Sequence, residues 1–120
     1  MNRRIVLIED DPDISALVVD MLIDAGHEVD VRSTLADGTI DRDTQLVITD
    51  LVVLRGYDLE AARAWVSRVR AAFPAAAVIV STAHRLAGAA GASDLGAEAV
   101  LTKPFDVDEF TRTVESLLGP

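Results

Sequence analysis

Several polar residues in this chain each end or directly follow an apolar run. They are the acidic pair Glu9 and Asp10, then Asp50, the hydroxyl residue Thr82, and Lys103. Carboxylates that are crowded together repel one another unless they are protonated or bridged by a cation. Oxygen ligands suit a hard ion, and Mg²⁺ most of all. A carboxylate can also attack phosphorus, and a lysine beside a bound cation would stabilise the charge on the phosphoryl oxygens. These residues therefore have the parts needed to accept a phosphoryl group on Asp50.

Lys103 is the one lysine among eleven basic residues, and the others are all arginine. Arginine is a planar fork, whereas lysine is a compact point charge on a flexible stem. The presence of lysine at this single position, just after an apolar stretch, indicates a contact that needs the compact ammonium group and that a guanidinium group would not reproduce.

The composition excludes several classes of protein. The 120 residues are half hydrophobic and include no cysteine, so we expect one domain with a real core and no disulfide or thiolate metal site. A cytoplasmic location is expected. The formal net charge of −9 argues against nucleic acid as a direct partner. No apolar run approaches the ~18 residues of a membrane span, and the run at residues 5–8 is too short for a secretory signal.

Strand and helix patterns alternate along the chain. Apolar or alternating runs predict strands at residues 4–9, 28–32, 45–49, 77–81 and 99–102. Helices are predicted after the N-cap residues Asp11, Asp58 and Asp106, and the first should stop at Gly26. Weaker helical segments, interrupted by glycine, are expected within 33–40 and 84–95.

Each of the three stronger helices has an apolar face that we expect to be buried. These faces are Ile14, Leu17, Val18, Met21, Leu22 and Ala25; Leu59, Ala62, Trp65, Val66, Val69 and Phe73; and Val107, Phe110, Val114, Leu117 and Leu118. We interpret Trp65 as packing between helix and sheet, and Arg63, Arg68 and Arg70 as a solvated helix face.

Strands separated by helices predict a parallel sheet that is covered on both faces. In such sheets the ligand site lies at the carboxyl ends of the strands, near the point where the strand order reverses. The acidic pair, Asp50, Thr82 and Lys103 follow or end the first, third, fourth and fifth predicted strands. Their convergence on one edge is a stronger indication of function than any one of them alone.

With these residues in place, the chain resembles the receiver domain of bacterial two-component response regulators, the CheY-like fold, from end to end. The matching stretches are residues 5–12 (IVLIEDDP), 46–50 (LVITD), 78–83 (VIVSTA) and 103–105 (KPF), with Gly96 and Ala97 before the last strand. The resemblance implies an α/β fold with a doubly wound five-stranded parallel sheet, (βα)5 and flavodoxin-like, in the strand order 2-1-3-4-5. It also implies a single receiver domain over residues 1–120, either a complete regulator or part of a longer one.

The same resemblance implies roles for the acidic residues. Asp50 would be the phosphoacceptor, taking a phosphoryl group from a histidine kinase or a His phosphotransfer protein. Glu9 and Asp10 would bind Mg²⁺ together with Asp50 and the backbone carbonyl of Val52. The protein would be a signalling phosphoacceptor rather than an enzyme.

Two further residues would complete the switch. Thr82 would be the switch hydroxyl, and Lys103 would contact the phosphate. We expect the signal to appear as a reordering of residues 83–95, after the fourth strand, and to be read by a downstream protein target.

Three positions depart from the family's usual pattern. Leu54 stands four residues after the acceptor in place of proline, Asp58 stands eight residues after it in place of glycine, and Val100 replaces an aromatic residue three positions before the lysine. None of these changes removes a catalytic group. They do leave a second interpretation open, a pseudo-receiver that binds proteins but is not phosphorylated.

Two other classes of protein compete with this interpretation. Asp11-Pro12-Asp13 is similar to the DxD motif of haloacid-dehalogenase-type phosphatases, in which Asp11 would be the nucleophile and Asp50 would go unexplained. A flavodoxin-like cofactor binder would need a hydroxyl- and glycine-rich phosphate loop after the first strand, where this chain is acidic. We interpret Asp11 as a helix cap, which leaves Glu9 and Asp10 as the metal-binding pair.

Overall fold

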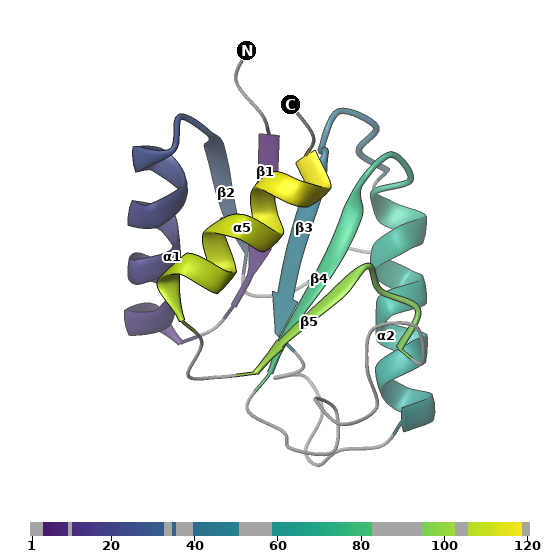
Figure 1. The fold of residues 1–120 in the computed structure, drawn as a ribbon. Coiled ribbons are helices and arrows are strands. Elements are labelled where there is room, and N and C mark those ends of the chain that lie inside the picture. Colours follow the sequence, from purple (N-terminus) through teal and green to yellow (C-terminus); the bar gives the residue numbers. More distant parts are fainter. Residues whose placement is uncertain are drawn as a thin grey trace.

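A five-stranded parallel sheet runs through the middle of the molecule (Figure 1). Its strands are β1 (Arg4–Ile8), β2 (Glu28–Arg32), β3 (Leu46–Asp50), β4 (Ala77–Thr82) and β5 (Ala99–Thr102). They pair in the order β2-β1-β3-β4-β5, which confirms the predicted topology. The computed structural model describes residues 4–9, 11–32, 35, 40–50, 59–82, 95–102 and 106–118.

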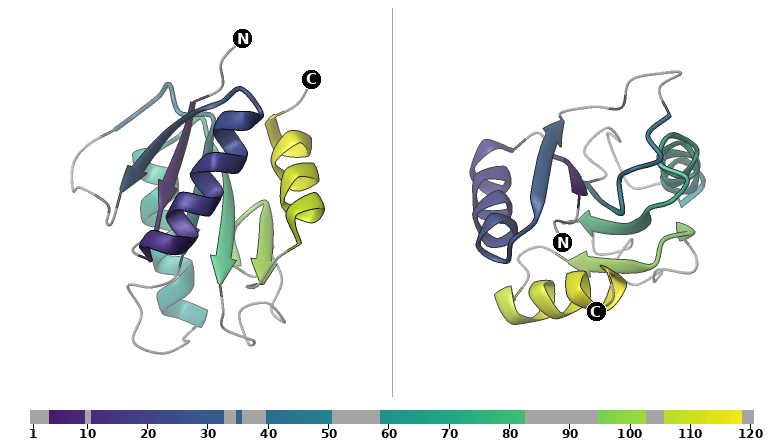
Figure 2. Two further views of the ribbon diagram at one scale, coloured as in Figure 1. Left: turned by 90° about the vertical axis from the view of Figure 1, so that its left-hand side faces the viewer. Right: turned by 90° about the horizontal axis from the view of Figure 1, so that it is seen from above.

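Three helices cover the sheet, namely α1 (Pro12–Asp24), α2 (Leu59–Ala72) and α5 (Val107–Leu118). The two further views show α1 and α5 on one face and α2 on the other (Figure 2). Two apolar clusters correspond to these two faces. The first joins the sheet to α2, and the second joins it to α1 and α5. None of the described helices is long and apolar enough to cross a membrane.

The central strands are buried on both sides of the sheet, which explains their nearly continuous apolar sequence. Residues 5–8 of β1 and residues 46–48 of β3 are all buried. The edge strand β2 instead alternates acidic and apolar residues, and its Val31 is exposed. Burial thus distinguishes the interior strands β1 and β3 from the edge strand β2.

The start of α1 is set by local chemistry. The Asp11 carboxylate accepts hydrogen bonds from the backbone N–H groups of Asp13 and Ile14 at 2.9 and 3.2 Å. Pro12 occupies the first turn, where its missing N–H costs nothing. Gly26, at φ +92°, ends the turn that follows the helix. The predicted cap and stop are both confirmed.

The last helix begins in the same way. The Asp106 carboxylate accepts from the backbone N–H of Asp108 at 2.7 Å and of Glu109 at 3.3 Å. Its capping role is therefore confirmed, whereas the third predicted cap, Asp58, lies outside the described residues.

The predicted helix faces are correct for α2 and too wide for α1 and α5. Leu17 and Val107 are each 53% exposed, and Ala25 is also exposed. The reason is that a helix lying on a sheet buries a narrow stripe, so residues at the margin of an apolar face remain in solvent. Val18 and Leu22 form that stripe in α1. On α2 the described members of the face are all buried: Ala62, Trp65, Val66, Val69 and, just past its end, Phe73.

The second and fifth strands have the predicted bounds, whereas the other three differ from the prediction by one residue at one or both ends. The first strand ends at Ile8, the third runs to Asp50 and the fourth to Thr82. The weak helices predicted within 33–40 and 84–95 fall mostly outside the described residues. Leu35 and Ile40, which are described, are not helical, whereas Leu95, the last residue of the second segment, is helical.

Candidate functional site

Glu9 and Asp50 lie at the carboxyl ends of neighbouring strands. Ile8 in β1 pairs with Thr49 in β3, and Glu9 and Asp50 are the next residues along. Glu9 continues the strand direction, since its N–H donates to the carbonyl oxygen of Arg32 at 3.0 Å. Two carboxylates therefore stand where the strand order reverses, which is where α/β sheets bind ligands.

The same edge continues through β4 and β5. Asp50 pairs with Ser81, and Thr82, the next residue, ends β4. Thr82 pairs with Thr102 at the end of β5, and Lys103 follows Thr102 directly in the sequence. The register therefore places the carboxyl ends of β1, β3, β4 and β5, each of which ends in or precedes a predicted site residue, along one edge of the sheet.

The described site residues differ in their exposure to solvent. Glu9 is buried, with 5% of its surface exposed, and its Oε2 accepts from the N–H of Asp11 at 3.4 Å. Thr82 is fully buried and Asp50 is half-buried. A buried carboxylate is costly unless it is hydrogen-bonded or paired with positive charge. The hydrogen bond from Asp11 partly offsets the cost of burying Glu9.

The remaining predicted site residues, Asp10, Val52 and Lys103, lie outside the described residues. Within the described ranges, no group of three or more His, Cys, Asp or Glu side chains could hold a metal ion. Glu9 and Asp50 provide two carboxylates, and Asp10 would be the third. Because these donors are all carboxylate oxygens, they fit a hard cation such as Mg²⁺ and not a thiolate-binding metal.

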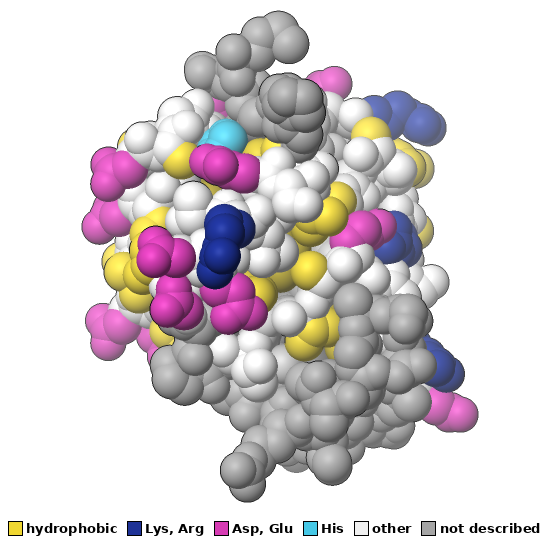
Figure 3. Space-filling view, in the orientation of Figure 1, with side chains coloured by type: hydrophobic (Ala, Val, Ile, Leu, Met, Phe, Trp, Pro, Cys, Tyr) yellow, Lys and Arg dark blue, Asp and Glu magenta, His cyan; other side chains and the backbone are white. Residues whose placement is uncertain are grey.

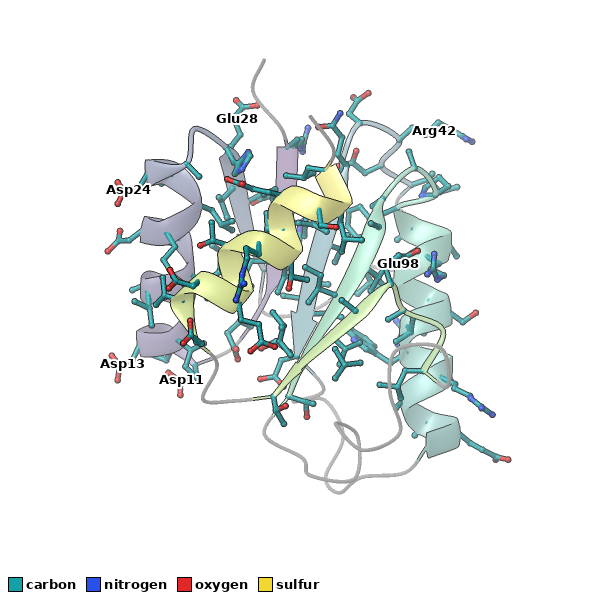
Figure 4. All side chains as sticks on the ribbon, viewed as in Figure 1. Asp11, Asp13, Asp24, Glu28, Arg42 and Glu98 are labelled. Carbon is teal, nitrogen blue, oxygen red and sulfur yellow. The ribbon has the colours of Figure 1, made fainter. Side chains whose placement is uncertain are left out.

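The side chain of Asp11 is used for helix capping. It is exposed, and its carboxylate is engaged by the first turn of α1. Figure 4 shows Asp11 and Asp13 at the end of α1 that lies nearest the carboxyl ends of the strands. This capping role explains why an aspartate stands at position 11, and it does not require Asp11 to be the nucleophile of a phosphatase.

Sequence analysis missed two polar links, one beside the site and one at the opposite end of the sheet, where β4 and β5 begin. The indole Nε1 of Trp65 donates to Thr49 Oγ1 at 2.9 Å, although its packing role was predicted correctly. Arg70 does not belong to a purely solvated face, because its guanidinium pairs with Glu98 at 2.7 Å. Neither link leaves a local pattern in the sequence, since each joins residues far apart in the chain.

Comparisons with known proteins agree with the fold. No family model matches the chain. The transcriptional regulatory protein TcrA of Mycobacterium tuberculosis (strain ATCC 25618 / H37Rv) is 36% identical over 125 residues, which cover 95% of this chain and 45% of TcrA. The chain thus spans less than half the length of this relative.

Solved structures match over nearly the whole chain. A response regulator receiver protein from Burkholderia phymatum is 26% identical, with a TM-score of 0.73 and coverage of 98% of this chain and 96% of that one. The response regulator TrrA from Thermotoga maritima, solved in complex with Mg(2+)-BeF, is 25% identical, with a TM-score of 0.68 and coverage of 96% and 98%. Strand order and these similarities together show that the chain has the fold of response regulator receiver domains and resembles them over nearly its whole length.

Proposed function

We propose that this receiver domain accepts a phosphoryl group on Asp50 from a histidine kinase or a His phosphotransfer protein and passes the signal to a protein partner. The strand register is the observation that carries the proposal. It brings Glu9, Asp50 and Thr82 from neighbouring strands to one edge of the sheet. Asp10 and Lys103 adjoin the same strand ends in the sequence.

The proposed reaction is a transfer from phosphohistidine to carboxylate. An oxygen of Asp50 attacks phosphorus, and an O–P bond forms as the P–N bond to the donor breaks, with the electron pair leaving on the imidazole nitrogen. Negative charge spreads over the phosphoryl oxygens. The ammonium group of Lys103 and the hydroxyl of Thr82 donate to these oxygens and stabilise that charge.

Mg²⁺ is the cation proposed for the site. Glu9, Asp10 and Asp50 would hold it with the backbone carbonyl of Val52, since hard oxygen donors suit Mg²⁺. When bound, it neutralises charge on the carboxylates and on the phosphoryl oxygens. The complex of TrrA with Mg(2+)-BeF supports this choice of ion.

The protein would act as the acceptor in a signalling reaction rather than as an enzyme that turns over substrates. Its proposed location is the cytoplasm, and its proposed partners are a phosphoryl donor protein and a downstream protein target. The proposed readout, a reordering of residues 83–95, concerns a segment outside the described residues.

Intact-mass measurement tests the acceptor. Incubated with Mg²⁺ and acetyl phosphate, the wild-type protein should gain one phosphoryl group, and Asp50→Asn should gain none. Asp11→Asn is the matched control, and it should be labelled like the wild type because Asp11 caps α1. Equal labelling of wild type and Asp50→Asn would refute the assignment. A wild type that stays unlabelled would favour the pseudo-receiver, and loss of label in Asp11→Asn alone would favour the phosphatase-like alternative.

A second variant tests the lysine in the same assay. Lys103→Arg keeps the positive charge but replaces a point contact with a planar fork. We expect it to be labelled more slowly than the wild type. Equal rates would show that any cation suffices at this position.

A further inference from the structure

The one tryptophan of the chain is hydrogen-bonded to the residue before the proposed acceptor. Trp65 lies on α2 and is 5% exposed, and its indole Nε1 donates to Thr49 Oγ1 at 2.9 Å. Thr49 lies on β3 and is completely buried. Both side chains are therefore shielded from water, and the bond between them ties the helix to the strand that ends in Asp50.

The direction of this hydrogen bond follows from the chemistry of the two groups. An indole N–H can only donate, whereas a threonine hydroxyl donates once and also accepts. Thr49 Oγ1 must accept from Trp65, so its own proton is available for another partner. That partner is the backbone carbonyl oxygen of Asp50, at 2.9 Å. The result is a directed chain of hydrogen bonds from Trp65 through Thr49 to Asp50, which we call the Trp65–Thr49 relay.

The carbonyl of Asp50 belongs to the peptide group that joins Asp50 to Leu51. A hydrogen bond to that oxygen restrains the rotation of this peptide, and so the direction in which the chain leaves the acceptor. Val52, whose backbone carbonyl is a proposed metal ligand, follows two residues after Asp50. Orientation of metal ligands by groups behind them commonly determines how well a metal binds.

We infer that Thr49 and Trp65 are positioning residues for the Asp50 site, so that α2 is coupled to metal binding and phosphorylation through the Trp65–Thr49 relay. The inference rests on the proposed function. It requires no contact between either side chain and the phosphoryl group. The alternative is that the two residues only satisfy each other's buried polar groups, in which case their removal would alter stability alone.

Four variants separate positioning from stability. Thr49→Val has nearly the same shape but removes both hydrogen bonds, and Thr49→Ser retains the hydroxyl. Trp65→Phe removes the indole donor but leaves the hydroxyl able to donate to Asp50. Val66→Ala is the matched control, because Val66 is buried in the same apolar cluster on the same helix and takes part in none of these hydrogen bonds.

Mg²⁺ affinity by titration calorimetry and the rate of labelling by acetyl phosphate are the two readouts. Losing a net hydrogen bond in Thr49→Val should weaken Mg²⁺ binding by about fivefold and slow labelling in parallel. Trp65→Phe should show a smaller loss in the same direction, and Thr49→Ser should recover the wild-type values. Val66→Ala should lower the melting temperature without changing Mg²⁺ affinity.

The emission of Trp65 gives a third readout, since no other tryptophan contributes. It should change when Mg²⁺ and beryllofluoride are added to the wild type and to Thr49→Ser, and should not change in Thr49→Val. If the wild type is labelled and all variants bind Mg²⁺ and react as it does, the inference is overturned while the proposed function stands. If the wild type is never labelled, the proposed function itself fails. Should Thr49→Val not fold, the comparison of Trp65→Phe with Val66→Ala decides the matter.

Discussion

At the scale of single residues, position in the fold decides what an aspartate does. Asp11 and Asp106 each precede a helix and accept from backbone N–H groups two and three residues onward. Asp41 accepts in the same pattern at a turn before β3. Asp50 differs because it ends an interior parallel strand at the switch point of the sheet. An aspartate thus caps a helix at Asp11 and Asp106, closes a turn at Asp41 and is the proposed acceptor at Asp50.

The Asp41 carboxylate accepts more hydrogen bonds than either Asp11 or Asp106. Its oxygens accept from the N–H of Asp43 at 2.9 Å and from both the N–H and the hydroxyl of Thr44, at 3.1 and 2.9 Å. Arg4 lies 3.4 Å away. Burial acts to raise the pKa of Asp41, but the hydrogen bonds and the positive charge of Arg4 together outweigh it, and the pKa lies below its usual value.

The lowered pKa makes Asp41 a source of stability that depends on pH. In the unfolded chain the Asp41 carboxyl group has a pKa of about 3.9. Ionised Asp41 stabilises the fold above that pH, and this contribution is lost as the pH falls through the lower pKa that the same group has in the folded protein. Asp41→Asn should therefore reduce the free energy of unfolding at pH 7 by about 1 kcal/mol. Urea denaturation should show a smaller deficit at pH 3 than at pH 7.

Asp43→Asn is the control for this measurement, because Asp43 is an exposed neighbour. Its free energy of unfolding should match that of the wild type at pH 7. A deficit in Asp41→Asn that is the same at pH 3 and pH 7 would contradict the electrostatic account.

At the scale of elements, side-chain hydrogen bonds join α2 to the sheet at two points along the helix. Trp65 joins the middle of α2 to β3, and Arg70 joins its last turn to the segment just before β5. The guanidinium of Arg70 donates to Glu98 Oε1 and to the carbonyl oxygen of Gly96, both at 2.7 Å. Glu98 Oε2 accepts from the buried N–H of Val78 at 2.6 Å. Figure 4 shows Glu98 beside the start of β5, where it stands between helix and sheet.

The contact with Val78 should matter more than the ion pair. Arg70 and Glu98 are 40% and 32% exposed, and exposed ion pairs contribute about 0–1 kcal/mol. An N–H left buried without an acceptor costs about 1–3 kcal/mol. Glu98→Ala should therefore lower the free energy of unfolding by about 2 kcal/mol, whereas Glu98→Gln, which keeps an acceptor, should lose less than about 1 kcal/mol.

Urea denaturation with hydrogen exchange at Val78 checks this expectation. The amide of Val78 should exchange faster in Glu98→Ala than in Glu98→Gln. Glu115→Ala, at an exposed glutamate on α5, should behave like the wild type. Equal losses in the two Glu98 variants would mean that the charge, and not the hydrogen bond to β4, is the stabilising element.

At the scale of the whole molecule, negative charge is the main electrostatic feature. The chain carries a formal charge of −9, and acidic side chains gather around α1 and the first part of α5 (Figure 3). The site adds Glu9 and Asp50 to this field. Self-repulsion of this kind destabilises the compact state, so a cation that binds only the folded form should stabilise it.

Mg²⁺ should therefore raise the melting temperature. At a concentration 100-fold above the dissociation constant, linkage predicts about 2.7 kcal/mol of added stability. The gain should be much smaller in Asp10→Ala, which would lose a proposed ligand. Sodium chloride at equal ionic strength controls for general screening. A melting temperature that responds equally to both salts would argue against a specific metal site.

The sequence by itself determined the order and type of the main elements, since periodicity, Asp11, Asp106 and Gly26 act within a few residues. It also determined that the polar strand ends share one edge, because parallel strands separated by helices all point the same way. The predicted convergence of Glu9, Asp50 and Thr82 on one edge is confirmed by the register. Their chemical roles stay predictions.

Only the tertiary structure decided how neighbouring layers meet. Sequence periodicity could not tell that Leu17 and Val107 stay in solvent while Val18 is buried, because the width of the buried stripe depends on the surface beneath the helix. The bond from Trp65 to Thr49 spans 16 residues, and that from Arg70 to Glu98 spans 28. Such contacts depend on how α2 packs against the sheet, and that packing cannot be deduced from a local pattern of residues.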